Sequence, residues 1–126
     1  SVALNKLNVE KKYINRVRQG FKMVMSSGTG IGYMDKAPSP AGKTGTSESF
    51  IDLDGDGVID AESITNNFVG YAPSTNPVMS LTASFPDIQN PNSGDYKSYA
   101  NQIIVSRATE IFFDLYNEKG IRIKKS

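Results

Sequence analysis

The sequence contains no cysteine and no histidine. Without cysteine, the chain has no thiol nucleophile, no disulfide and no cysteine-ligated metal site. Without histidine, neither a Ser-His-Asp triad nor a histidine-ligated zinc site can be built from its own residues. Any acid–base chemistry must therefore use lysine, tyrosine, aspartate or glutamate. The lack of cysteine is also compatible with an extracytoplasmic bacterial setting.

A strong net charge and long apolar runs are missing as well. The 126 residues carry a formal net charge of +1, which gives no reason to expect nucleic acid or an anionic membrane as the main partner. The longest apolar runs are only a few residues long, too short to span a bilayer. With 38% hydrophobic and 21% charged residues, the chain has the composition of at most one globular domain.

The spacing of apolar residues predicts a helix near each end of the chain and strands between them. Apolar positions recur at helical spacing from Val9 to about Ser26 and again from about Ser98 to Glu118. Between them, short turn segments separate three β-type stretches, expected at about 42–51, 64–72 and 78–85. Short connections between successive strands imply an antiparallel meander. The predicted fold class is α+β, with an antiparallel sheet flanked by helices.

Some local features of these elements can also be predicted. Asn8 is the expected N-cap of the first helix. In the third strand, four apolar residues alternate with polar ones and should share one face: Met79, Leu81, Ala83 and Phe85. The apolar stripe of the first helix consists of Tyr13, Ile14, Val17, Phe21, Val24 and Met25. The last helix should pack on the sheet through Ile103, Ala108, Ile111, Phe112 and Leu115.

The most distinctive stretch is Ala41-Gly42-Lys43-Thr44-Gly45-Thr46-Ser47-Glu48, at the start of the first strand. A strand projects alternate side chains to the same side, so Thr44 and Thr46 should present their hydroxyls together. The glycines have no Cβ, which lets a ligand backbone approach the main chain. The long side chain of Lys43 should reach the same neighbourhood. These features suit a substrate that carries a carboxylate and lies alongside the strand.

Two glycine-rich segments resemble phosphate-binding loops, and neither fits. Gly28-Thr29-Gly30-Ile31-Gly32 follows a helix and has no helix after it, so no helix N-terminus is available to hold an anion. Gly42-Lys43-Thr44 matches only the end of the Walker motif, and a strand pattern follows it where a helix is needed. A phosphate-loop function is therefore rejected for both segments.

The connection between the first two strands is rich in aspartate. Asp52-Leu53-Asp54-Gly55-Asp56-Gly57 matches the start of a calcium loop, and Asp60 supplies a further carboxylate at the ninth loop position. The twelfth position, normally a bidentate glutamate, is Ser63. Asp52, Asp54, Asp56 and Asp60 are thus candidate calcium ligands, and a solvated acidic turn is the alternative interpretation because Asp and Gly favour turns.

The order of motifs resembles that of one enzyme family. The Lys43-Thr44-Gly45-Thr46 strand is followed by a hairpin, then by Asn67-Phe68-Val69-Gly70-Tyr71-Ala72-Pro73, a proline-bounded turn, a third strand and an amphipathic helix. This order resembles the C-terminal part of the transpeptidase domain of class B penicillin-binding proteins, and the Gly28-Thr29-Gly30 segment fits as well. The resemblance covers about residues 9–118. It implies that residues 1–126 are a C-terminal fragment of one such domain.

Such enzymes are D,D-transpeptidases that cross-link peptidoglycan stem peptides and are acylated by β-lactams. The family uses S-x-x-K, S-x-N and K-T-G motifs. Only K-T-G is present here in the expected place, because no serine has a lysine three positions on and Ser74-Thr75-Asn76 follows the K-T-G strand instead of preceding it. The fragment alone is therefore expected to be inactive.

The resemblance implies roles for four residues. Lys43 would supply positive charge to the active site. The hydroxyls of Thr44 and Thr46 would bind the substrate carboxylate, next to Gly45. The backbone N–H of Thr46 would be one of two oxyanion-hole donors, and the second would belong to the absent nucleophile. No cofactor is required in this family.

The implied partners are the stem peptide, β-lactams and the missing N-terminal half of the domain. Residues 78–85 would offer an open strand edge that favours self-association. The parent protein would act on the outer face of a bacterial cytoplasmic membrane, with its anchor outside this chain. Two alternatives stay open: a serine β-lactamase or β-lactam sensor on the same fold, and a calcium-dependent binding module in which Lys43 is incidental.

Overall fold

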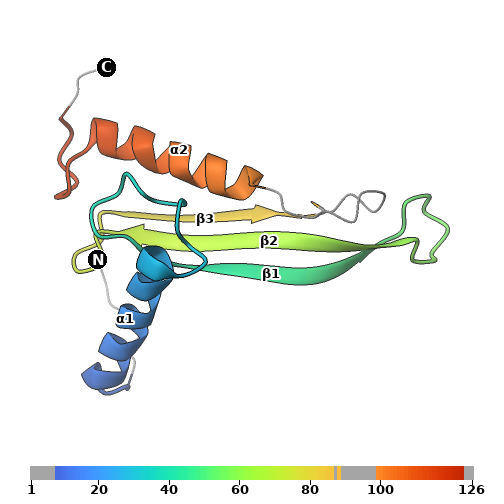
Figure 1. The fold of residues 1–126 in the computed structure, drawn as a ribbon, viewed down its shortest axis with the longest axis horizontal. Helices are drawn as coiled ribbons and strands as arrows, with labels where there is room; N and C mark the ends of the chain where they lie inside the picture. The colour runs from blue at the N-terminus through green and yellow to red at the C-terminus, as the bar shows by residue number, and fades with distance from the viewer. Residues whose placement is uncertain (1–7, 87, 89–98, 124–126) are drawn as a thin grey trace.

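The computed structural model describes residues 8–86, 88 and 99–123. It contains two helices and three strands in the order α1, β1, β2, β3, α2 (Figure 1). The bounds are α1 Lys11–Ser27, β1 Ala41–Ile51, β2 Ala61–Ala72, β3 Met79–Phe85 and α2 Ala100–Leu115. The predicted α+β class and the predicted order of elements are confirmed.

The strands form one antiparallel sheet in the order β1-β2-β3. Register is set by pairs such as Thr44 with Phe68 and Ile51 with Ala61 in the first hairpin, and Phe68 with Ala83 in the second. Residues opposite each other in an antiparallel pair project to the same face. The alternating exposure along β3 confirms its predicted apolar and polar faces. β1 and β2 are the longer strands, and their hairpin extends beyond both helices (Figure 1).

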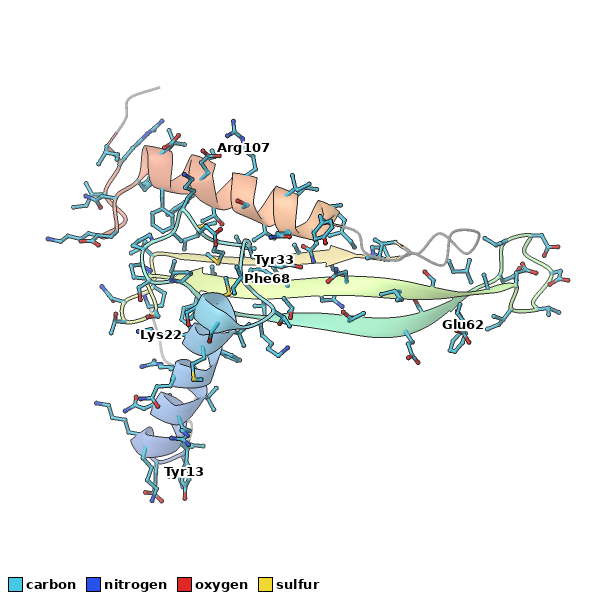
Figure 2. All side chains as sticks on the ribbon, viewed as in Figure 1. Tyr13, Lys22, Tyr33, Glu62, Phe68 and Arg107 are labelled. Carbon is cyan, nitrogen blue, oxygen red and sulfur yellow. The ribbon has the colours of Figure 1, made fainter. Side chains whose placement is uncertain are left out.

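Helix α1 contacts the sheet only near its C-terminal end. Met25 is buried, whereas Tyr13, at the far end of the helix from the sheet (Figure 2), is 56% exposed. The predicted N-cap, Asn8, is wrong: the helix begins at Lys11, and Glu10 occupies the N-cap position without a side-chain capping bond. The backbone N–H of Tyr13 donates to the carbonyl of Glu10, and a carboxylate at this end also complements the helix dipole.

The core lies where the segment 28–40 crosses β2. Tyr33 stacks on Phe68 with ring centroids 4.5 Å apart (Figure 2), and Met34 packs over Gly70. A Cβ on Gly70 would lie 2.6 Å from the Met34 sulfur, so this close packing requires glycine. The buried members of the core are Met25, Tyr33, Met34, Ala37, Phe68, Ala72 and Val105.

Helix α2 packs on the sheet through a different face from the predicted one. Its buried residues are Asn101, Val105 and Thr109. Of the five predicted residues, Ile103 is 64% exposed and Ala108 and Ile111 are also exposed, whereas Phe112 and Leu115 are half-buried. The apolar residues of this helix occupy more than one face, so periodicity alone could not identify the side that meets the sheet. Asn101 decides the docking locally, because its Nδ2 donates to the backbone carbonyl of Asn66 on β2 at 3.3 Å. Within the described residues, neither helix is long and apolar enough to cross a membrane.

Candidate active site on strand β1

The Lys43–Thr46 stretch lies at the start of β1, on an edge of the described sheet. Thr44 is half-buried and pairs with Phe68, while Lys43, Gly45 and Thr46 are exposed. Because side chains alternate along a strand, Thr44 and Thr46 lie on the face that the 28–40 segment and α2 cover. Every second N–H of an edge strand also points away from the sheet, which leaves backbone donors for a ligand.

The hydroxyl face of this stretch is in contact with the turn that ends α1. Thr29 Oγ1 and Thr44 Oγ1 are 2.6 Å apart, a hydrogen bond in which either hydroxyl can donate. Thr29 stands between two glycines that pack against the last turn of the helix. A Cβ on Gly30 would lie 2.5 Å from the Met25 sulfur, and one on Gly28 would lie 3.0 Å from the Val24 backbone. The turn therefore holds Thr29 against β1.

Lys43 projects from the opposite face of β1. Its ammonium group donates a hydrogen bond to the backbone carbonyl of Thr44, so the side chain folds back along its own strand. A hollow of about 300 Å³ lies beside it, lined by Lys43, Thr44, Gly45, Asn67, Phe68, Val69 and Thr82. Gly45 contributes to this space because it has no side chain above Asn67. The prediction that Lys43 reaches the neighbourhood of the two threonine hydroxyls is therefore wrong for this structure, because the lysine leaves β1 on the opposite face from the threonines.

Tyr33 is the one buried tyrosine among the described residues. Burial raises the pKa of its phenol, and the Asn66 side chain opposes that shift through a hydrogen bond. A raised pKa keeps the phenol neutral at physiological pH. Its stacking on Phe68 and its bond to Asn66 assign it to the support of the sheet and not to proton transfer.

The acidic turn brings three of its four predicted carboxylates together. One oxygen from each of Asp52, Asp54 and Asp60 lies within 4.8 Å of the others, and all three residues are exposed. Asp56 lies outside this group, so the predicted four-residue ligand set is not assembled among the described residues. Both oxygens of Asp52 already accept backbone hydrogen bonds, Oδ1 from Gly55 at 2.6 Å and Oδ2 from Gly57 at 2.7 Å. These bonds lower the pKa of Asp52, and the bond from Gly57 has the largest effect.

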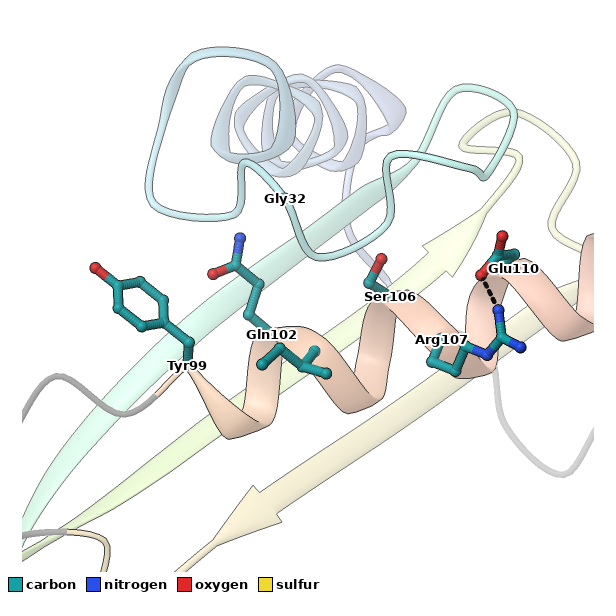
Figure 3. A pocket seen from close by; sticks show the side chains of 7 residues that line it. Gly32, Tyr99, Gln102, Ser106, Arg107 and Glu110 are labelled. Atoms are coloured by element: carbon teal, nitrogen blue, oxygen red, sulfur yellow. Dashed lines mark hydrogen bonds and ion pairs between the residues drawn. The ribbon is translucent and has the colours of Figure 1, made fainter.

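A second hollow, of about 460 Å³, lies between α2 and the segment around Gly32 (Figure 3). Gln102 closes one side by donating from Nε2 to the carbonyl of Ile31 at 3.2 Å, and Arg107 pairs with Glu110 at 2.6 Å. The remaining lining residues are Tyr99, Ile103 and Ser106. None of the residues predicted for catalysis or binding lines this hollow.

Comparison with known proteins assigns the family. Residues 1–110 match the family model described as penicillin binding protein transpeptidase domain. The chain belongs to this family. The predicted resemblance to class B penicillin-binding proteins is thereby confirmed.

Individual relatives of this family support the assignment. Penicillin-binding protein 2A of Bacillus subtilis is 34% identical over 84 residues, 66% of this chain and 12% of the relative. Penicillin-binding protein 2B of Streptococcus pneumoniae is 37% identical over 107 residues, 80% of this chain and 15% of the relative. A solved structure of penicillin-binding protein 2B from strain R6 matches with a TM-score of 0.59 and 34% identity, covering 80% of this chain and 16% of that structure. The chain thus spans only a small part of the length of the penicillin-binding proteins that it matches.

Sequence reasoning missed one polar contact of the Lys43–Thr46 stretch, the bond between Thr29 and Thr44. The Gly28-Thr29-Gly30 segment fits the family resemblance and is rejected as a phosphate loop, but residue spacing cannot reveal that this turn folds back onto a strand that begins a dozen residues later. The available signal was the threonine itself, a hydroxyl residue between two glycines directly after a helix.

Proposed function

We propose that this chain supplies the K-T-G strand of a D,D-transpeptidase active site, which cross-links peptidoglycan stem peptides and is acylated by β-lactams. The observation that carries the proposal is the position of Lys43–Thr46 at the edge of the sheet in a chain of this family. An extended peptide can lie along such an edge and use its unpaired backbone groups.

Each residue of the stretch has a distinct role in this proposal. Thr44 and Thr46 donate their hydroxyl protons to the carboxylate of the stem peptide or of the β-lactam. Gly45 allows the ligand backbone to approach, because a glycine at this position leaves the strand uncovered. Lys43 supplies positive charge, and the backbone N–H of Thr46 stabilises the oxyanion that forms when the acyl carbonyl is attacked.

The nucleophilic serine belongs to the remainder of the domain, because the sequence contains no S-x-x-K motif. We therefore infer that residues 1–126 form a C-terminal piece of one transpeptidase domain and are inactive alone. The parent protein works on the outer face of a bacterial cytoplasmic membrane, where its substrate is found. The hydrolase and sensor variants of the same fold are not favoured by any feature of the described residues.

The test compares the complete protein with this chain after incubation with a reactive penicillin, using mass spectrometry to detect the acyl adduct. We expect an adduct on the complete protein and none on the chain alone. Lys43→Ala should slow acylation of the complete protein roughly 10- to 100-fold, since a hydrogen bond to a charged group contributes about 1.5–3 kcal/mol. Thr46→Val should be milder because it keeps the backbone donor.

Lys36→Ala, an exposed lysine of the preceding segment, is the control and should leave the rate unchanged. Equal rates for Lys43→Ala and the unaltered protein would contradict the assignment of Lys43. An adduct on the isolated chain would show that one of its own serines is a nucleophile.

The open edge of β3 supports a proposal about partners. Among the described residues no strand pairs with the outer side of β3, and its sequence is half apolar. In the complete domain this edge pairs with a strand from the N-terminal half, and in the isolated chain it pairs with a second copy. Sedimentation over a range of concentrations should show self-association, and a monomer at every concentration would count against it.

Calcium binding at the acidic turn is a second candidate function, favoured by the convergence of Asp52, Asp54 and Asp60. A cation that binds only the folded chain must raise its stability, by about 1.4 kcal/mol at a free concentration ten times the dissociation constant. We expect millimolar calcium to raise the melting temperature of the chain and not that of Asp54→Asn. Equal melting temperatures with and without calcium would leave the turn as a solvated acidic connection.

A further inference from the structure

The bond between Thr29 and Thr44 connects the proposed carboxylate site to a residue outside the K-T-G motif. A hydroxyl has one proton to donate and two lone pairs that accept. The oxygen–oxygen distance of 2.6 Å lies within the range of a strong O–H···O bond, so one of these two protons is engaged between the residues. Which hydroxyl donates decides what Thr44 can offer to a ligand.

We propose that Thr29 is a positioning residue that orients the hydroxyl of Thr44 toward the substrate carboxylate. This inference rests on the proposed function of Thr44. An ionised carboxylate only accepts hydrogen bonds, so Thr44 must donate its proton to it. The bond to Thr29 can then persist only with Thr29 donating to Thr44 Oγ1. In this direction Thr29 also polarises the Thr44 hydroxyl, because a hydroxyl that accepts one bond becomes a better donor.

The turn around Thr29 is built to hold this geometry. The backbone N–H of Gly30 donates to the carbonyl of Val24 at 3.0 Å, which ties the turn to the last turn of α1. Gly30 is buried against Met25 and Val24, and Gly28 lies equally close to the Val24 backbone. The Thr29 side chain itself is exposed, so its role is not to fill the core. Helix α1 therefore determines where the Thr29 hydroxyl meets β1.

The experiment measures second-order acylation rates of the complete protein with benzylpenicillin and with its neutral methyl ester. Thr29→Val removes the hydroxyl at nearly constant shape and should slow acylation by benzylpenicillin roughly 2- to 10-fold, the range expected for one neutral hydrogen bond. The rate with the methyl ester should not change, because the ester lacks the anionic carboxylate that Thr44 binds. Thr29→Ser, which restores the hydroxyl, should recover most of the rate.

Two further variants test whether Thr29 acts through its bond to Thr44. In a Thr44→Val background, Thr29→Val should cause no additional loss, since the two residues act through one bond. Ser27→Ala removes a nearby hydroxyl that bonds only within α1, to the carbonyl of Met23, and should behave like the unaltered protein.

The outcomes separate this inference from the proposed function. If Thr44→Val slows benzylpenicillin and Thr29→Val does not, the role of Thr29 is wrong and that of Thr44 stands. A Thr29→Val variant that slows the ester as much as benzylpenicillin would show a general structural effect and would also overturn the inference. Unchanged rates for both Thr44→Val and Lys43→Ala would overturn the proposed function together with this extension of it.

Discussion

Strands β1 and β2 have two ends with opposite environments. Near the helices, Phe68 is 1% exposed, and Gly42 and Gly70 pair across the two strands beneath Met34 and the aromatic stack. Beyond the helices, the same strands form a hairpin in which Phe50 is 59% exposed (Figure 1). At its tip, aspartate side chains bond to backbone amides of the turn. The end near the helices is held by packing against other segments. The hairpin end is held by the hydrogen bonds between its two strands and within its turn.

The candidate site lies at the border between these two environments. Thr44 is half-buried opposite the buried Phe68, whereas the residues from Gly45 to Glu48 are exposed. A ligand can therefore reach the strand where its backbone is still anchored by the core. A preorganised binding strand must be held rigid by packing and must still be accessible to a ligand. The core provides the first condition on one side of β1, and the open edge provides the second.

The largest expected effect comes from making the same substitution, phenylalanine to alanine, at the packed end and at the exposed end of the two strands. Phe68→Ala should lower the free energy of unfolding of the chain by about 3–5 kcal/mol, because it leaves a cavity under Tyr33. Phe50→Ala removes the same side chain from the exposed hairpin and should change the free energy of unfolding by about 0.5 kcal/mol or less. Urea titrations of both variants measure the difference. Similar losses would mean that the hairpin is buried in solution.

A second pair of variants tests glycines on the two sides of the border. Gly70→Ala would place a Cβ 2.6 Å from the Met34 sulfur and should destabilise the chain by about 1–3 kcal/mol through overpacking. A Cβ on Gly45 meets the Asn67 Cβ at an ordinary 3.7 Å, so Gly45→Ala should cost less than about 1 kcal/mol. In the complete protein, Gly45→Ala should nevertheless slow acylation. Normal acylation by this variant would argue against ligand approach at Gly45.

The smallest expected effect concerns the turn at the hairpin tip. The pKa of Asp52 is lowered from its ordinary value of 3.8, mainly by the backbone bond from Gly57. A group whose pKa is lower in the folded state stabilises the fold above its unfolded pKa and loses that contribution as the pH falls through the folded value. Between about pH 5 and pH 2, the unaltered chain should therefore lose slightly more stability than Asp52→Asn.

Urea titrations at both pH values measure this effect. Glu62→Gln, an exposed carboxylate at the base of the same hairpin, is the matched control and should follow the unaltered chain. If Asp52→Asn and the unaltered chain lose the same stability, the bonds to Gly55 and Gly57 do not persist in solution.

Local patterns were sufficient for the elements and for the family. The alternation in β3, the turn residues between the strands and the helical spacing near both ends depend on neighbours in the sequence, and the structure has these elements close to the predicted bounds. The left-handed backbone at Gly55 and Gly57, with φ of +80° and +89°, follows from the same turn chemistry. The Lys-Thr-Gly-Thr stretch could likewise be placed at the start of a strand, because this assignment depends only on its neighbours in the sequence.

Contacts between distant segments could not be predicted in this way. The sheet-facing side of α2 is chosen by Val105 in the core and by the bond from Asn101 to Asn66, although the isoleucines of the other face are more hydrophobic. Lys43 and Thr44 must leave β1 on opposite faces because they are adjacent in a strand, but the sequence could not say which of the two faces the core. Pairing across the sheet determined that side.

The sequence by itself determined the α+β class, the order of the strands and the place of the Lys-Thr-Gly-Thr stretch at the start of β1, because propensity and periodicity act over a few residues. The tertiary structure alone decided that Thr29 meets Thr44, that only the end of α1 packs on the sheet, and that Asp56 stays apart from the other carboxylates. These outcomes depend on the packing of segments that are distant in the chain. Close packing and hydrogen bonds between such segments select one arrangement among several that the local pattern allows.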